Sequence, residues 1–158
     1  MAIINVSAGD EAVLSIADSE ANANVTSANG LTVPYIQDIT VNNSTGVFRW
    51  KTLDNTAESA VTTPATNQLS LNLVVDTDAF FGSSNTDLVV NDGIYGCSTN
   101  KRRVYFRVHF DGTDSGSKYI SGSGFISGLA PTTNMDAPVW VTPVTIEVDG
   151  DYSSVGTI

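Results

Sequence analysis

The stretch QLSLNLVV, residues 68–75, decides the fold class of this chain. Its three leucines occupy every second position, and the side chains between them, Ser70 and Asn72, are polar. A period of two is the repeat of a β-strand that has one face against a core and the other toward solvent. The stretch therefore predicts a half-buried strand, the kind found in antiparallel sheets.

Further strands are predicted on both sides of this stretch. They are expected, from their alternation or their β-branched and aromatic content, at residues 34–41, 47–53, 104–110, 119–129 and 139–148. The first two are expected to form a hairpin through residues 42–46. No strand–helix–strand alternation is present, so the strands should pair antiparallel. The predicted fold class is mainly β, an antiparallel β-sandwich or barrel, in one domain over residues 1–158.

One short flanking α-helix is expected near residues 85–95. Polar residues that cap helices come first, and Gly96 is expected to end it. Gly93 is a weak point, because glycine inside a helix costs about 1 kcal/mol. Residues 54–67 lack periodicity and are expected to form a long loop, of the kind that is often functional. Pro143 indicates an edge or a bulge in the last strand.

The charge of the chain excludes one class of function. The chain has 17 acidic and 7 basic residues, for a formal net charge of −10. Binding nucleic-acid phosphates requires clustered Lys and Arg, so the chain is not expected to hold DNA or RNA. The seven bases are Arg49, Lys51, Lys101, Arg102, Arg103, Arg107 and Lys118. They either keep the surface solvated or form two small basic spots that meet acidic patches on neighbouring copies.

No catalytic, cofactor or metal site is predicted. The chain has one cysteine, Cys97, and one histidine, His109, which are too few for a structural zinc site or an internal disulfide. His109 lies in the middle of an expected strand, so a surface or interface position is predicted rather than a catalytic one. No stretch approaches the ~20 apolar residues of a membrane span, and no signal peptide is expected.

From Gln68 to Gly150, the order of the elements resembles that of the major tail tube proteins of long non-contractile phage tails. The similar segments are QLSLNL (68–73), the expected helix, VYFRVHFDG (104–112), YISGSGFIS (119–127) and VTIEVDG (144–150). Nearer the N-terminus, IQDIT (36–40) and the loop around Trp50–Pro64 resemble more loosely a strand pair and an inter-ring loop. The 130–138 loop departs from the family pattern.

The resemblance implies a structural virion protein and not an enzyme. It implies that six copies close into a ring, that their inner strands join into one β-barrel, and that rings stack into a tube. Genomic DNA would pass through this tube without specific binding. The implied partners are further copies of the chain and the tape-measure, tail-tip and tail-terminator proteins, with no cofactor and no membrane. The implied location is the virion tail, after assembly in the host cytoplasm.

Three groups of site residues are expected from this resemblance together with alternation and charge. Small polar and acidic side chains suit a channel wall that gives DNA no anchor, since salt screens the remaining repulsion within about 8–10 Å. The lumen-lining candidates are Asp38, Ser70, Asn72, Asp76, Asp78, Ser121, Ser123 and Ser127. The inter-ring candidates are Arg49, Trp50, Lys51, Asp54 and Glu58. The inter-subunit candidates are Lys101, Arg102, Arg103 and Arg107.

Two other functions stay open. A different virion β-module, such as a capsid decoration or tail-tip protein, would share the acidic composition but form a trimer or stay monomeric. A carbohydrate-binding module would need a row of exposed aromatic rings, for which the candidates are Tyr35, Trp50, Tyr119 and Trp140. Trp50 and Trp140 are expected to face a core, which counts against this module.

Overall fold

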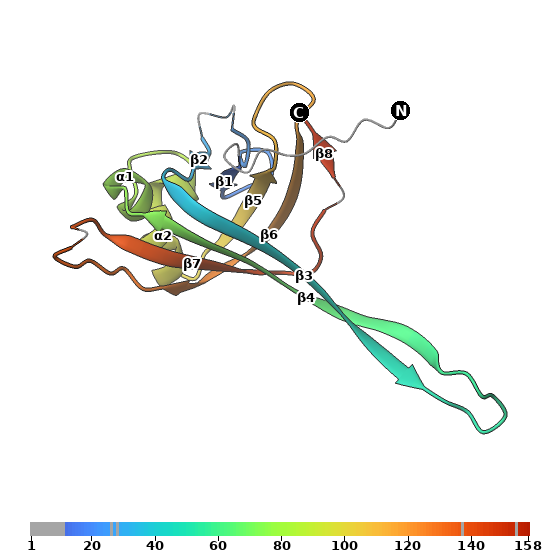
Figure 1. Cartoon of the computed structure of the whole chain (residues 1–158). Helices are drawn as coiled ribbons and strands as arrows, with labels where there is room; N and C mark the ends of the chain where they lie inside the picture. The colour runs from blue at the N-terminus through green and yellow to red at the C-terminus, as the bar shows by residue number, and fades with distance from the viewer. Residues whose placement is uncertain (1–11, 26, 28, 137, 154) are drawn as a thin grey trace, which may run out of the picture.

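The computed structural model describes residues 12–25, 27, 29–136, 138–153 and 155–158. The elements in chain order are β1 (Val13–Ala17), β2 (Leu31–Thr32), β3 (Ile36–Trp50), β4 (Ser59–Val74), α1 (Thr77–Phe81), α2 (Leu88–Thr99), β5 (Arg103–His109), β6 (Lys118–Leu129), β7 (Val141–Val148) and β8 (Gly156–Thr157). Figure 1 shows a rounded body from which the far part of β3 and β4 projects as a long hairpin.

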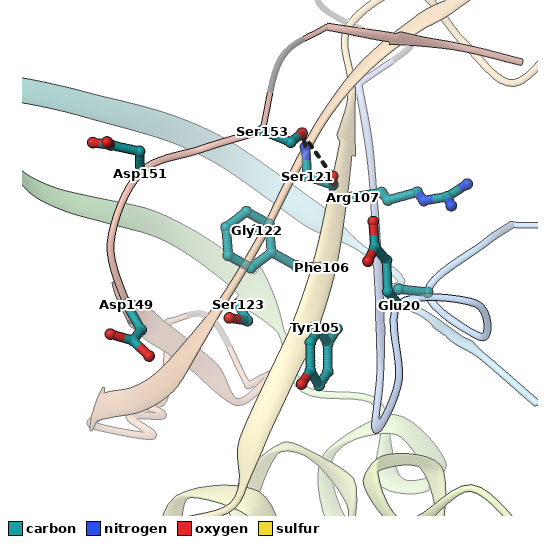
Figure 2. Close-up of a pocket in the computed structure, with 11 residues that line it drawn as sticks. Glu20, Tyr105, Phe106, Arg107, Ser121, Gly122, Ser123, Asp149, Asp151 and Ser153 are labelled. Atoms are coloured by element: carbon teal, nitrogen blue, oxygen red, sulfur yellow. Dashed lines mark hydrogen bonds between the residues drawn. The ribbon is translucent and has the colours of Figure 1, made fainter.

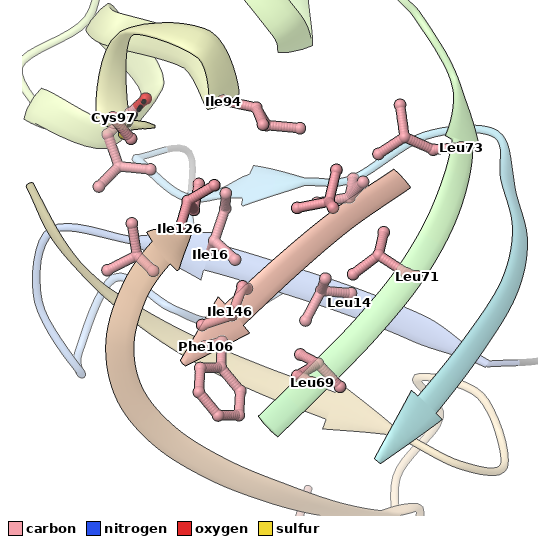
Figure 3. Close-up of a cluster of buried hydrophobic side chains, with 14 of the residues drawn as sticks. Leu14, Ile16, Leu69, Leu71, Leu73, Ile94, Cys97, Phe106, Ile126 and Ile146 are labelled. Atoms are coloured by element: carbon pink, nitrogen blue, oxygen red, sulfur yellow. Dashed lines mark hydrogen bonds between the residues drawn. The ribbon is translucent and has the colours of Figure 1, made fainter. Parts of the chain in front are cut away.

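The described strands form one antiparallel sheet in the order β2-β1-β5-β6-β7-β4-β3, and β8 pairs with β6. The sheet bends so that β1 and β5 lie across the core from β4 and β7 (Figure 3). Its two end strands, β2 and β3, do not pair with each other, so the sheet is open. The prediction of a mainly β, antiparallel fold is confirmed.

The core between the two halves of the sheet is built by the predicted alternation. In β4 the three leucines are buried, and in β5 the apolar residues Val104, Phe106 and Val108 are buried with them. Ile126 of β6 and Ile146 of β7 complete the contact between the halves. Helix α2 adds Ile94 and Cys97 from one side of the sheet. Apolar burial of this kind contributes about 25 cal/mol per Å² and dominates the stability of the fold.

The expected hairpin through residues 42–46 is wrong, because this polar segment lies within the single strand β3. β3 pairs with β4 from Ile36↔Leu73 to Trp50↔Ser59, and the turn of the hairpin is residues 51–58. The expected loop over 54–67 is therefore shorter, since its second half is strand. Pro64 lies at a β-bulge, where the register of β3 and β4 shifts between Thr45 and Val47. A residue at a bulge is not paired in the strand ladder, so the missing N–H of proline costs no hydrogen bond there.

The helical region also differs from its prediction. α1 was not expected, and α2 begins at Leu88 and continues past Gly96 to Thr99. Gly93 has φ 73° and ψ 179°, a non-helical conformation that kinks α2 where the sequence indicated a weak point. A Cβ on Gly93 would meet backbone atoms of Phe80 and Gly82 within 3 Å, so the two helices pack backbone against backbone here.

Pro143 does not lie in an edge strand. β7 is internal, with β4 on one side and β6 on the other. The pairing between β6 and β7 ends at Leu129↔Val144, so Pro143 lies one residue beyond the last β6–β7 pair. Proline has no N–H, and at this position no hydrogen bond between β6 and β7 is lost. The expectation of an edge or a bulge at Pro143 is therefore wrong, and the nearest register shift lies in the neighbouring strand β6, between Ile126 and Gly128.

Candidate functional site

One face of the sheet, opposite the core, is polar across four strands, β3, β4, β7 and β6. Asp38 of β3 lies directly beside Asn72 of β4, whose side-chain amide donates to both carboxylate oxygens at 3.0 Å. Gln68, also on β4, donates to Glu147 of the next strand, β7, at 2.8 Å, and the Ser127 hydroxyl of β6 donates to the same carboxylate at 3.4 Å. We call this surface, made of Asp38, Gln68, Ser70, Asn72, Ser127, Thr145 and Glu147, the polar face.

The polar face brings together four of the eight lumen-lining candidates: Asp38, Ser70, Asn72 and Ser127. Its charged members are the carboxylates of Asp38 and Glu147, and none of its members is a Lys or Arg. Strand alternation was sufficient to find the serine and the asparagine on β4. The contribution of Glu147 was missed, because only strand pairing shows that β7 lies beside β4.

The other four lumen-lining candidates lie elsewhere. Ser121 and Ser123 line a separate hollow of about 220 Å³ between β5, β6 and the segment 149–153 (Figure 2). Ser121 is buried there, with its hydroxyl 2.7 Å from that of Ser153. Asp76 and Asp78 lie at the start of α1, just after the end of β4. Asp76 caps this helix by accepting hydrogen bonds from the backbone amides of Asp78 and Ala79 at 3.1 Å each.

All five inter-ring candidates are at or beside the turn of the β3–β4 hairpin, and all are exposed. β4 pairs with β7 only from Gln68 onward, so residues 59–67 extend beyond the body by about 30 Å at ~3.3 Å per residue. Hydrogen bonds from the Thr52 hydroxyl and from its own backbone amide hold the pKa of Asp54 below its ordinary value, so it stays negative.

The far part of the hairpin carries exposed apolar side chains, of which only Trp50 was among the sequence-based candidates. Phe48 and Trp50 lie on one face of β3 with their rings stacked at a centroid distance of 6.0 Å. Val61 lies directly opposite Phe48 on β4, and Leu53 is fully exposed in the turn. We call Phe48, Trp50, Leu53 and Val61 the hairpin tip. The expectation that Trp50 faces a core is wrong, because the body of the chain ends before it.

The base of the hairpin is held by two residues. The Asn67 side chain donates to the Gly150 carbonyl at 2.9 Å and accepts from the Ser44 amide at 3.3 Å. The Tyr152 hydroxyl lies 2.7 Å from the Asn42 carbonyl and contacts the β4 backbone at Gln68 as well. These contacts tie the projecting strands to the C-terminal segment and limit how they swing.

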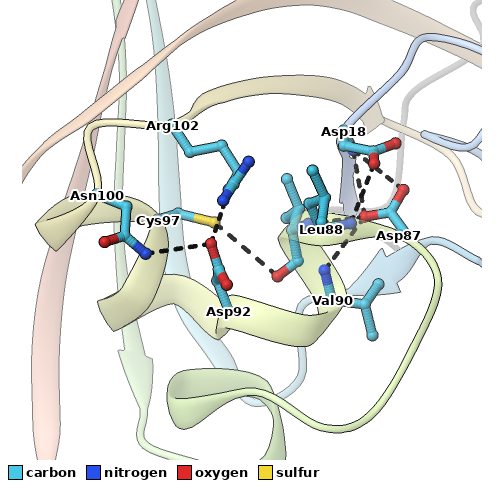
Figure 4. A network of polar contacts seen from close by, with 9 residues as sticks. Asp18, Asp87, Leu88, Val90, Asp92, Cys97, Asn100 and Arg102 are labelled. Atoms are coloured by element: carbon cyan, nitrogen blue, oxygen red, sulfur yellow. Dashed lines mark hydrogen bonds and ion pairs between the residues drawn. The ribbon is translucent and has the colours of Figure 1, made fainter.

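The inter-subunit candidates are mostly engaged within the chain. Arg102 forms an ion pair with Asp92 at 2.7 Å (Figure 4). Arg103 forms one with Asp149 at 2.7 Å and also lies over the Phe125 ring. The Arg107 guanidinium lies 4.6 Å from the centre of the Tyr119 ring. Only Lys101 has no such contact with another described residue.

A pair of carboxyl groups joins β1 to the start of α2 (Figure 4). Asp87, almost fully buried, accepts from the backbone amides of Val89 and Val90 and from that of Asp18. Burial, and then the hydrogen bond with Asp18, raises the pKa of Asp87. Burial also acts to raise the pKa of Asp18. The hydrogen bonds that Asp18 accepts, first from the Leu88 amide and then from its other partners, outweigh burial, so the pKa of Asp18 is lowered.

Cys97 and His109 are buried residues. Burial, and then the nearby Asp92 carboxylate, raises the pKa of the Cys97 thiol to about 12, so the thiol is unreactive. His109 is fully buried, which contradicts its predicted surface or interface position, and neither ring nitrogen has a hydrogen-bond partner. Burial, and then the positive charge of Arg107, lowers the pKa of His109, so the imidazole is neutral.

A second hollow, of about 630 Å³, opens where β4 passes into α1. It is lined by Val75, Thr77, Phe80, Phe81, Tyr95, Pro131 and Trp140. Phe81, Tyr95 and Trp140 are each more than half exposed. We call it the aromatic hollow. Trp140 was expected to face a core, and that expectation is wrong, because Trp140 lies on the rim of an open hollow formed by α1 and α2, and α1 was not predicted.

Among the described residues, no group of three or more His, Cys, Asp or Glu side chains is arranged to hold a metal ion. None of the helices in the described ranges is long and apolar enough to cross a membrane.

No protein-family model and no curated protein sequence matches the chain. Several solved structures share its fold. A chain from the tail of an empty gene transfer agent particle with C6 symmetry aligns with a TM-score of 0.65 and 10% identity, covering 94% of this chain and 98% of that one. A chain from the virion of a native gene transfer agent particle has a TM-score of 0.61 and 8% identity, covering 94% and 100%. A chain from the sixfold-symmetrised baseplate of the anti-feeding prophage has a TM-score of 0.52 and 10% identity, covering 100% and 97%.

Proposed function

We propose that this protein is a structural subunit of a phage-type tail, which assembles with itself into stacked hexameric rings that form the tail tube. The observation that carries the proposal is the match of nearly the whole chain, in both directions, to a chain from a C6-symmetric tail. At 10% identity, this match supports a shared fold only. The proposed function is therefore argued from the surfaces of this chain.

The first supporting surface is the open edge of the sheet. β3 has 15 residues, and its outer edge pairs with no other described strand. A long unpaired edge recruits other strands, because its N–H and C=O groups lack partners, and soluble proteins normally cover it. In the proposed ring this edge pairs with a neighbouring copy, and closure of the barrel across six copies leaves no edge exposed.

The second supporting surface is the polar face, which we assign to the wall of the channel. DNA moving through a channel must not be held by it, and cationic side chains would bind phosphates by releasing counterions. The polar face offers the carboxylates of Asp38 and Glu147 and small hydrogen-bonding groups such as Ser70. Six copies would give a negative, hydrated wall with which DNA makes no lasting contact.

The remaining expectations belong to the same proposal. The hairpin turn with Asp54 and Glu58 contacts the next ring, and Lys101 contacts a neighbour within the ring. The tape-measure, tail-tip and tail-terminator proteins are the other partners, and the assembly takes place in the host cytoplasm before the tail joins the virion. The subunit acts by shape and charge and not as an enzyme.

Electron microscopy of the purified, concentrated protein in negative stain tests the proposal. Rings or hollow tubes with sixfold end views are the expected result. A discrete trimer would instead indicate a capsid decoration protein, and particles of any other closed symmetry would overturn the hexameric tube.

A further inference from the structure

Two apolar surfaces lie at opposite ends of one strand. The hairpin tip surrounds the start of β4 at Ser59, and the aromatic hollow begins at Val75, immediately after the end of β4. The 16 residues of β4 separate them by about 50 Å at ~3.3 Å per residue. In Figure 1 the turn of the hairpin and α1 are correspondingly far apart. Because a continuous strand separates them, the tip of a chain cannot enter its own hollow.

The shapes and chemistry of the two surfaces match. The tip is a projection with two stacked rings, Phe48 and Trp50, and the hollow is a concave site rimmed by aromatic side chains. Its volume of about 630 Å³ is in the range of about 300–1,000 Å³ that encloses ligands larger than one aromatic ring. Contiguous exposed apolar patches on a soluble chain usually mark interaction sites.

Charges beside the two surfaces are complementary. Arg49 and Lys51 flank Trp50 on the hairpin, and neither forms an ion pair within the described part of the chain. Asp76 and Asp78 flank Thr77, which lines the hollow. Opposite charges around matching apolar surfaces fix the orientation of a complex and speed its formation.

We propose that the hairpin tip of one copy docks in the aromatic hollow of a second copy of this chain, with Arg49 and Lys51 facing Asp76 and Asp78. The inference rests on the proposed self-assembly and adds the receiving site to it. An interface between two different patches is heterologous, so each copy keeps a free tip or a free hollow for the next copy. This head-to-tail order suits a polymer that grows along one direction.

Such a contact would be weak between two single copies and strong between two rings. A tip buries only a few side chains, and small interfaces form transient complexes. When six copies are held in one ring, the first contact holds the others close to their sites, so six weak contacts act together. The subunit would thus remain soluble before assembly and add to a tube that already presents a complete ring.

Site-directed cross-linking tests the contact. One protein carries Leu53→Cys at the tip and a second carries Thr77→Cys in the hollow, and the native Cys97 is buried and unreactive. The two proteins are mixed at high concentration and treated with a short bismaleimide linker. The expected result is a cross-linked dimer containing one copy of each, at least tenfold more abundant than with a control mixture in which Thr113→Cys, in an exposed loop, replaces Thr77→Cys.

Matched variants separate the tip from general effects on folding. Phe48→Ser with Trp50→Ser should reduce the cross-linking yield at least tenfold and leave the melting temperature unchanged. Val155→Ser, at an exposed apolar residue that belongs to neither surface, should leave the yield unchanged. In a charge exchange, Arg49→Asp with Lys51→Asp should lower the yield, and Asp78→Arg in the other partner should restore it.

The outcomes distinguish this inference from the proposed function. Tubes that form normally but give no tip-to-hollow cross-link would overturn the docking proposal and leave the tube intact. Cross-linking between tip and hollow in an assembly that lacks sixfold rings would uphold the docking and overturn the hexameric tube. A protein that gives neither cross-link nor assembly at high concentration would overturn both. Wild-type yield from the Phe48→Ser, Trp50→Ser double variant would show that other contacts hold the copies together.

Discussion

His109 is the only histidine of the chain, and it is buried without hydrogen-bond partners for either ring nitrogen. Its lowered pKa has a definite consequence for stability. Between the folded-state pKa and the ordinary value of 6.5, the unfolded chain binds a proton that the folded chain does not. The free energy of unfolding should therefore decrease as the pH falls below about 6.5. Asp111, whose charge acts in the opposite direction, reduces the shift without reversing it.

The variant His109→Phe should remove this pH dependence. It fills a similar volume beside Tyr119 and leaves no unpaired ring nitrogen, so the stability at pH 7 should be equal or higher. Urea denaturation at pH 5, 6 and 7 measures the slope. An unchanged slope in the variant would assign the pH dependence to other groups.

Asp87 and Asp76 provide a matched comparison of two helix caps. Each accepts hydrogen bonds from the first turn of a helix, but Asp87 is almost fully buried and also holds the Asp18 amide. Asp87→Ala should lower the free energy of unfolding by about 2–4 kcal/mol, because it removes the cap and leaves buried amides without acceptors. Asp76→Ala should cost about 1 kcal/mol. Equal losses in chemical denaturation would show that burial of Asp87 adds nothing.

At the scale of an element, the kink of α2 depends on Gly93. Gly93→Ala should cost about 3 kcal/mol or more, because its backbone conformation is nearly restricted to glycine and a Cβ would overlap the backbone of α1. Gly116→Ala is the control, since Gly116 also has a positive φ of 94°, but a methyl group added there would meet no atom within 4 Å. That variant should cost about 1–2 kcal/mol, from backbone strain alone. Thermal unfolding of both variants measures the difference.

The rigidity of the β3–β4 hairpin should depend on the contacts of Tyr152 and Asn67 at its base. Tyr152→Phe removes the hydroxyl that bonds the backbone of β3 and β4 but keeps the ring against Phe106. The stability should fall by only about 1 kcal/mol, while amide hydrogen exchange over residues 43–66 becomes faster. Tyr105→Phe is the control, because the Tyr105 hydroxyl forms no hydrogen bond with another described residue. Unchanged exchange in the Tyr152 variant would show that Asn67 holds the hairpin alone.

At the scale of the whole molecule, the assignment of the polar face to the channel wall predicts that this face does not retain DNA. Ser70→Lys adds one positive charge per copy to that face, and six copies would place a ring of lysines in the proposed channel. Tubes of this variant should retain DNA at low salt and release it as salt is raised, because the bound phosphates give up condensed counterions.

The control for this experiment is Thr113→Lys, which changes the net charge equally but lies in an exposed loop away from the polar face. DNA co-sedimentation with assembled tubes measures both variants. Equal retention by the two would place Ser70 outside the channel.

The local pattern of the chain was sufficient for most strands and for the class of the fold. Alternation in residues 68–75 and 104–110 determines which side chains are buried, because a strand turns each successive side chain to the opposite face. The kink at Gly93 was also visible as a weak point, because the conformational freedom of glycine is a property of the residue itself. Alternation also found Ser70 and Asn72 of the polar face, whereas Asp38 was chosen for its charge and only strand pairing places it beside Asn72.

Only the tertiary structure decided what surrounds each element. Polar residues 42–46 were interpreted as a turn, yet they belong to β3, because pairing with β4 supplies the hydrogen bonds that local preference does not. Trp50 and Trp140 were assigned to a core, since aromatic burial depends on neighbours that are distant in sequence, and both are exposed. His109 was assigned to a surface for the same reason and is buried. Composition and alternation thus determined the kind of fold, whereas strand pairing decided which surfaces and which strand edge remain exposed.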